Sequence, residues 1–182
     1  MTRKWHFAVG WLLASVLGVA ALSGCSLFGG DDEVATDKPP QIEVGSDGRV
    51  KNSIRTLTNE QGSYKITVDV IELKRSDKAA RMVFAVTPQS KGGSDPLSSS
   101  FFSTDTLGDD VSDVYLIDTK NLRKYPVLTA GEECVCSDGV SEYTLDQPTP
   151  LFADYPLPPE DIDSMTVVFG DVGPLPGVEV SS

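Results

Sequence analysis

Hydrophobic and polar residues alternate along much of the chain after residue 60, a pattern typical of β-strands with one buried face. Between residues 64 and 70 the even-numbered positions are apolar and the odd-numbered positions are polar. The phase then changes, because Ile71 and Leu73 are apolar. One extra residue in the strand, a β-bulge near Val70 and Ile71, explains this change of face.

The next segments predict a return strand and a hairpin. Residues 81–87 follow a turn and are apolar enough on both faces to lie in the middle of a sheet. Residues 114–117 and 123–128 flank a short polar turn and predict a β-hairpin. Pro126 has no amide donor, so we expect the second strand of this hairpin to lie at a sheet edge or to place Pro126 at a position without a hydrogen bond.

Three more short strands are expected at residues 143–145, 165–169 and 178–180, and Phe101 and Phe102 are expected to anchor the end of a polar loop in the core. The pattern thus predicts about seven short strands and no amphipathic helix of useful length. Short strands separated by turn signals are typical of an antiparallel β-sandwich. An all-β sandwich is therefore the expected fold class.

The first 25 residues follow a different pattern. A short basic start (1–6) precedes an apolar run (7–21) that has the length of a signal-peptide core and is too short to span a bilayer comfortably. The run ends in small residues before Cys25, and Leu-Ser-Gly-Cys at this place resembles the bacterial lipoprotein box. The resemblance implies that Cys25 becomes the N-terminus and carries a diacylglyceryl group, which anchors the chain on the extracytoplasmic face of the cell membrane. The alternative is an ordinary secretory signal with a coincidental cysteine.

Residues 26–50 contain few apolar side chains and no regular period, so they are expected to remain a flexible acidic linker. The sequence therefore predicts three parts. They are a lipoprotein signal peptide (1–24), a lipidated N-terminus with a disordered linker (25–50), and a β-sandwich domain (51–182).

Charge and histidine content exclude several classes of function. Removal of residues 1–24 takes away Arg3 and Lys4, which changes the formal charge from −12 to −14, and a chain of this charge is repelled by nucleic acid. The only histidine, His6, leaves with the same segment. A histidine-free domain cannot build a Ser-His-Asp or Cys-His site, or a histidine-ligated zinc site. No cofactor motif is present, so we expect no cofactor and no enzymatic activity.

Cys134 and Cys136 are the two cysteines left after lipidation, an even number in an oxidising compartment. In a fully extended strand their Cα atoms would lie near the upper limit for a disulfide, so closure requires a bent backbone. The favoured interpretation is a structural disulfide. A redox-active bridge, unpaired thiols and a metal-bound pair remain open.

Acidic residues dominate the last third of the chain. Eleven acids and no lysine or arginine follow Lys124, whereas residues 51–124 hold eleven basic and ten acidic residues. One explanation is packing of Arg81 and other early basic residues against the acidic late strands. The other is an acidic surface that meets a basic partner or divalent cations, although no segment has the spacing of an EF-hand. The residues proposed for such a surface are Glu132, Glu133, Asp138 and Glu142.

A family resemblance combines several of these segments. Val114–Asp118, Lys124–Leu128, the Cys-Val-Cys-Ser at residues 134–137 and Tyr155–Pro159 together resemble small secreted actinobacterial lipoproteins with an immunoglobulin-like extracellular domain of unknown function. The resemblance covers about residues 60–180 and implies an immunoglobulin-like sandwich and an envelope location, with no catalytic residues.

The function expected from the sequence is a lipid-anchored, non-catalytic binding module. Its partners would be the membrane, through the lipid, and an envelope protein or glycan. The first rival is a redox accessory lipoprotein that uses Cys134 and Cys136. The second is an enzyme with a carboxylate site, for which the acidic segment 109–113 is the weak candidate.

Overall fold

The structure is a computed structural model, and it describes residues 41–92, 96–98, 102 and 109–182. The predicted signal peptide, Cys25 and the first part of the predicted linker lie outside the described residues. Residues Lys38–Ser182 form one compact unit. Within the described part of this unit, no helix is long and apolar enough to cross a membrane.

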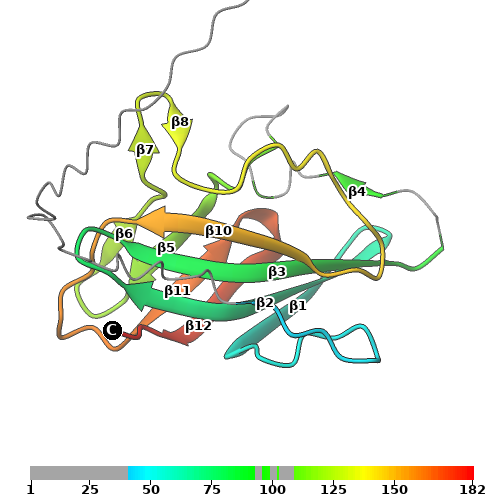
Figure 1. Cartoon of the computed structure of the whole chain (residues 1–182), viewed down its shortest axis with the longest axis horizontal. Helices are drawn as coiled ribbons and strands as arrows, with labels where there is room; N and C mark the ends of the chain where they lie inside the picture. Colours follow the sequence, from blue (N-terminus) through cyan, green and yellow to red (C-terminus); the bar gives the residue numbers. More distant parts are fainter. Residues whose placement is uncertain (1–40, 93–95, 99–101, 103–108) are drawn as a thin grey trace, which may run out of the picture. The chain divides into compact units, whose positions relative to one another are not determined.

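The fold is an all-β sandwich built from two four-stranded antiparallel sheets (Figure 1). The first sheet has the order β1 (Arg55–Gln61), β2 (Tyr64–Arg75), β3 (Ala80–Ser90) and β10 (Thr149–Tyr155). The second has the order β12 (Gly173–Glu179), β11 (Ser164–Phe169), β5 (Val114–Asp118) and β6 (Arg123–Tyr125). Two small ribbons pair β4 (Leu97–Ser98) with β9 (Glu142–Tyr143) and β7 (Thr129–Ala130) with β8 (Glu133–Cys134). A 3₁₀ turn, η2 (Gly170–Val172), leads into β12. The immunoglobulin-like strand order implied by the resemblance stays a prediction.

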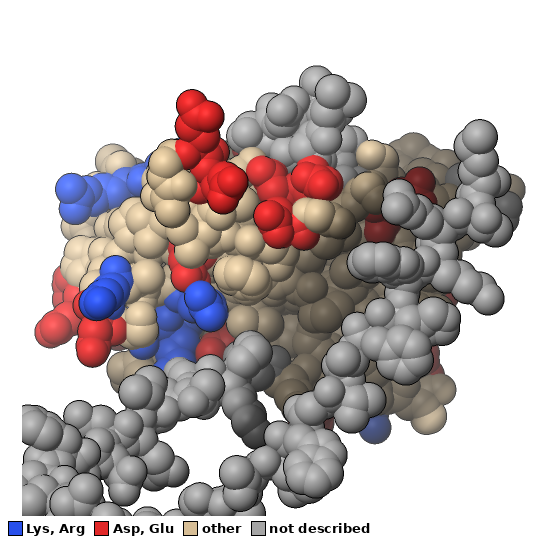
Figure 2. Space-filling view, turned by 45° about the horizontal axis from the view of Figure 1, so that its top comes forward, with Lys and Arg blue, Asp and Glu red and all other residues tan. Residues whose placement is uncertain are grey.

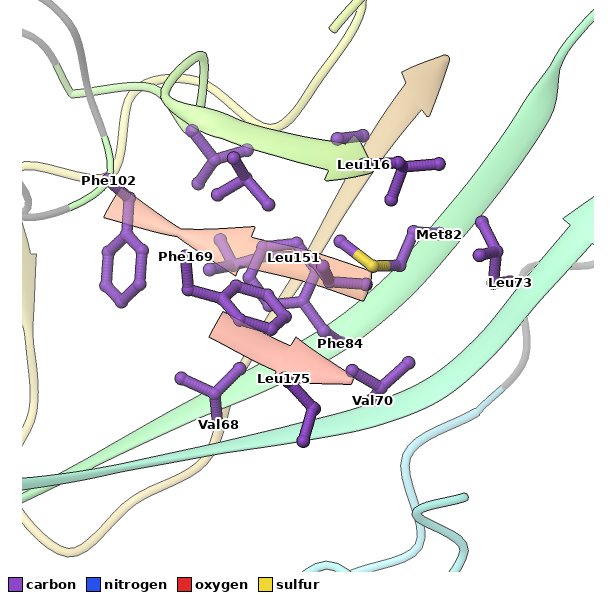
Figure 3. Close-up of a cluster of buried hydrophobic side chains, with 14 of the residues drawn as sticks. Val68, Val70, Leu73, Met82, Phe84, Phe102, Leu116, Leu151, Phe169 and Leu175 are labelled. Atoms are coloured by element: carbon purple, nitrogen blue, oxygen red, sulfur yellow. The ribbon is translucent and has the colours of Figure 1, made fainter. Parts of the chain in front are cut away.

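The two sheets share one hydrophobic core (Figure 3). Phe84 from β3 meets Phe169 from β11 at a ring-centroid distance of 5.3 Å. At one end of the core Phe102 packs edge-on against Tyr143 at 5.7 Å, which confirms the prediction for Phe102, whereas Phe101 lies outside the described residues. Burial of these aromatic rings removes large apolar surfaces from water and so stabilises the core.

Several predictions from the pattern are confirmed. The pairing of β2 with β3 shifts register between Val70 and Glu72, which is the bulge expected from the change of phase. β3 lies inside the first sheet, as its apolar faces indicate. β5 and β6 form the predicted hairpin, and β6, which ends before Pro126, is the edge strand of the second sheet.

The predicted linker boundary at residue 50 is wrong. Residues 41–50 fold back on the first sheet, where Val44 and Val50 form a β-bridge. Val50 and Ile42 pack against Val83 and the rest of a small cluster on the outer face of this sheet. The physical reason is that a strand apolar on both faces needs cover on its outer side as well, and the N-terminal segment supplies it.

β1 was not predicted, because Leu57 is its only apolar residue. Its inward-facing polar side chains instead join the two sheets along one side of the sandwich. Arg55 Nε donates to the carbonyl of Gly177 at 2.9 Å, and Asn59 Nδ2 donates to the carbonyl of Val172 at 2.6 Å. Gln61 donates similarly to the carbonyl of residue 171. These hydrogen bonds satisfy carbonyl groups at the edge of the second sheet.

Candidate polar groove on the first sheet

The register of β1, β2 and β3 arranges polar side chains in rows on the outer face of the first sheet. Ile66, Val68 and Val70 face the core, so the odd-numbered residues of this part of β2 face outward. Residues paired across neighbouring strands share a face. The three outward rows are Thr58–Thr67–Thr87, Thr56–Asp69–Ala85 and Glu60–Lys65–Gln89.

A groove of about 450 Å³ lies over most of these rows. Thr58, Thr67 and Thr87 form part of its floor, and the segment 47–50 and Asp146 also line it. The backbone at Gly48 is left-handed, with φ of 75°, and a Cβ at this position would lie 3.8 Å from the carbonyl oxygen of Asp146. The segment 47–50, whose Val50 covers the apolar part of the outer face, therefore also borders the groove.

Hydrogen bonds hold several of the lining side chains in place. Thr56 Oγ1 donates to Asp69 Oδ1 at 2.6 Å, and Asp69 is only 7% exposed. The hydroxyls of Thr58 and Thr67 lie 3.3 Å apart. On β3, Gln89 Nε2 donates to Asp146 Oδ1 at 3.1 Å. The groove is thus a pre-arranged polar surface rather than a set of unrestrained side chains.

Charges of both signs are present at the groove. Asp47, Asp69 and Asp146 contribute three carboxylates, and Arg49 and Lys65 contribute two cations. Beside it, Lys91 Nζ lies 2.5 Å from the carboxylate of Glu60. The hydrogen bond from Lys91 is the main cause of the lowered pKa of Glu60, and the positive charge of Lys91 is the second cause. The groove therefore has nearly balanced charge although the whole chain is strongly acidic.

The lining can donate and accept hydrogen bonds, which is the chemistry of non-covalent recognition. Each threonine hydroxyl supplies one donor and two acceptor positions. Across the part of the chain that the structure describes, no group of three or more His, Cys, Asp or Glu side chains could hold a metal ion. The arrangement is suited to holding a polar ligand against the sheet.

Cys134 and Cys136 form a disulfide with their Cα atoms 5.3 Å apart. Cys134 ends β8, and Cys136 forms a β-bridge with Ala153 of β10. Next to this bridge Ser137 N donates to the carbonyl of Phe152 at 2.9 Å. The disulfide therefore connects the β7–β8 ribbon to a segment that covers the otherwise free edge of β10.

The four acidic residues proposed as an interaction surface are all exposed. Glu132 and Glu133 belong to the β7–β8 ribbon, Asp138 follows the disulfide, and Glu142 lies on β9. Figure 2, which turns the top of Figure 1 forward, shows acidic side chains gathered on the upper part of this face and basic side chains mainly at its left. None of the four lines the groove, and their role in binding stays a prediction.

One early basic residue does pair with a late acid, as the packing explanation expects. Arg81 on β3 binds Asp154 on β10 through two hydrogen bonds of 2.7 and 2.8 Å. The guanidinium also lies 4.9 Å from the ring centre of Phe152. The side-chain hydrogen bonding to Asp154 is the main cause of the raised pKa of Arg81.

The sequence did not reveal the groove, because its rows exist only once three strands are in register. Two features of the sequence could have indicated it. They are the polar residues at the outward positions of β2 and the mostly polar sequence of β1, the strand before it.

Comparison of the chain with family models, with curated proteins and with solved structures finds no match. The resemblance to actinobacterial lipoproteins therefore stays a prediction.

Proposed function

We propose that the chain is a lipid-anchored, extracytoplasmic binding module of the cell envelope that acts without catalysis, and that the groove on the first sheet is its binding site. The observation that carries this proposal is the groove itself. Its volume of about 450 Å³ lies within the range of ligand sites in proteins. Its lining is held in place by hydrogen bonds before any ligand arrives.

The predicted anchor supports the envelope location. Two acyl chains on Cys25 suffice for stable membrane attachment. Fifteen residues separate Cys25 from Gln41, where the described chain begins. If these residues form the predicted linker, they would span about 20–25 Å, and this distance would keep the groove near the membrane. The partners of the module are thus the membrane, through the lipid, and an envelope protein or glycan.

Binding of the full chain to cell envelopes stripped of membrane lipid by detergent tests the proposal, because the lipid anchor then has no bilayer to enter. Thr67→Arg places a long charged side chain on the floor of the groove and should abolish saturable retention. Thr166→Arg is the matched control, because Thr166 is a half-buried strand threonine whose neighbours Met165 and Val167 face the core, so it faces outward from the second sheet. Equal retention of both variants would exclude the groove as the binding site. The anchor is tested separately by the mass of the mature chain, which should begin at an acylated Cys25.

The rival redox function keeps one specific observation in its favour, the disulfide between Cys134 and Cys136. Glu132 and Glu133, which precede the disulfide in the sequence, are negatively charged, and negative charge nearby disfavours the thiolate that a redox function needs. The measurement that separates the two functions is the reduction potential. A structural bridge should lie below about −300 mV, whereas a value above about −200 mV would favour the redox role.

A further inference from the structure

The central row of the groove carries hydroxyls on three adjacent strands. Thr58 pairs with Thr67, and Thr67 pairs with Thr87, so the three side chains stand on neighbouring strands about 4.8 Å apart, and the hydroxyls of Thr58 and Thr67 lie 3.3 Å from each other. Each hydroxyl can donate or accept by rotating about its C–O bond. A ligand that also presents groups able to donate and accept, at repeated intervals, would match this row.

The charged groups of the lining argue against a strongly charged ligand. Three carboxylates and two cations leave the groove close to neutral. A polyanion would meet Asp47, Asp69 and Asp146, and a polycation would meet Arg49 and Lys65. Like-charge contacts of this kind disfavour both classes.

The shape and the apolar content of the groove argue against a peptide. Peptides bound along a sheet gain affinity from backbone pairing at a free edge and from apolar pockets for their side chains. This groove lies on the face of three paired strands rather than along the edge of β1, and among the described residues that line it Val50 is the only large apolar one. Neither source of peptide affinity is present at this place.

We infer that the groove binds an uncharged, hydroxyl-rich saccharide chain, laid across the threonine row of β1, β2 and β3. The inference rests on the proposed function and names its ligand class. The threonine hydroxyls and the Gln89 amide donate to and accept from the sugar hydroxyls. Asp69, held by Thr56, supplies a fixed acceptor in the middle of the adjacent row, Thr56–Asp69–Ala85.

Amide chemical shifts of the full ¹⁵N-labelled chain, in a detergent without a sugar headgroup, test the ligand class. The probes are chitotetraose and maltotetraose as neutral saccharides, sulfated dextran as the anionic probe and tetralysine as the cationic one. At least one neutral tetrasaccharide should shift amides in residues 56–58, 65–69 and 87–89 saturably. Thr67→Val removes one hydroxyl at nearly constant shape and should weaken this binding by about 3–10-fold. Thr166→Val should leave it unchanged.

The outcomes separate the inference from the proposed function. If a charged probe shifts the groove amides and neither saccharide does, the saccharide class is wrong but the groove remains a binding site. If no probe shifts these amides at millimolar concentration, the saccharide inference is overturned, and retention on envelopes decides the function independently. If saccharide shifts fall elsewhere, or if both threonine variants lose affinity equally, the placement on the threonine row is wrong.

Discussion

The ion pair between Arg81 and Asp154 should respond very unequally to removal of its two members. The side chain of Arg81 is 49% exposed, whereas that of Asp154 is 11% exposed. Arg81→Leu leaves a nearly buried carboxylate without its partner. Asp154→Asn leaves a half-exposed guanidinium that water can solvate, and the new amide oxygen can still accept one hydrogen bond.

The size of each effect follows from these exposures. Loss of the charge-assisted hydrogen bonds to a carboxylate that water reaches poorly costs about 2–3 kcal/mol. The contact of Arg81 with the Phe152 ring adds about 0.5 kcal/mol at a site this exposed. For Asp154→Asn the exposed guanidinium reduces the cost to about 1 kcal/mol. The difference between the variants is therefore about 1.5–2.5 kcal/mol in the free energy of unfolding.

Urea denaturation followed by circular dichroism at pH 7 measures both free energies by linear extrapolation. Arg123→Leu is the matched control, because Arg123 is an exposed arginine on the edge strand β6, and it should change stability by less than about 0.5 kcal/mol. An Arg81→Leu variant that is as stable as Asp154→Asn would refute the argument that burial of the carboxylate determines the cost.

Three further predictions concern the disulfide, the β5–β6 turn and the N-terminal segment. Replacing Cys134 and Cys136 by Ser should lower stability by only about 1–2 kcal/mol, because the bridge closes a loop of three residues, and reduction of the wild-type chain should lower its Tm to the same value; an unchanged Tm would contradict a structural role. Asp118→Ala should lower Tm at pH 7. Burial raises the pKa of Asp118, but hydrogen bonds from the Asn121 side chain and from nearby backbone amides outweigh it and lower the pKa below the usual value. The contribution of the carboxylate is therefore present above about pH 4 and is lost as the pH falls further, so the Tm difference from wild type should shrink in acid; a difference independent of pH would count against this. Val50→Ala should cost about 1–2 kcal/mol, whereas Val44→Ala, at a position 52% exposed, should cost almost nothing in the same urea assay; equal small effects would mean that the segment does not stabilise the sheet.

The local sequence pattern was sufficient to predict the strands in which apolar and polar residues alternate regularly. The bulge at Val70 and the edge position of the strand before Pro126 follow from two or three neighbouring residues, and both are confirmed. β10 was missed because Pro150 and Asp154 interrupt its apolar pattern. Asp154 is tolerated in this strand because Arg81 of the neighbouring strand neutralises it.

The candidate site could be predicted only in part. The pairing of Cys134 with Cys136 depends on residues two positions apart and is confirmed. The groove depends on Thr58, Thr67 and Thr87, which only strand register brings together. The folded state of residues 41–50 was also hidden, because their few apolar side chains gain stability from a distant surface rather than from one another.

The side-chain bridge from β1 to the second sheet has an asymmetric consequence for sequence drift. The donors are particular side chains, those of Arg55, Asn59 and Gln61, whereas the acceptors are main-chain carbonyls, which every amino acid possesses. A saturation library should accordingly tolerate many substitutions at the exposed Asp171 and few at Asn59. Residue 171 should therefore vary more in sequence than Asn59, whereas the acceptor Gly177 is constrained by its φ of 70°.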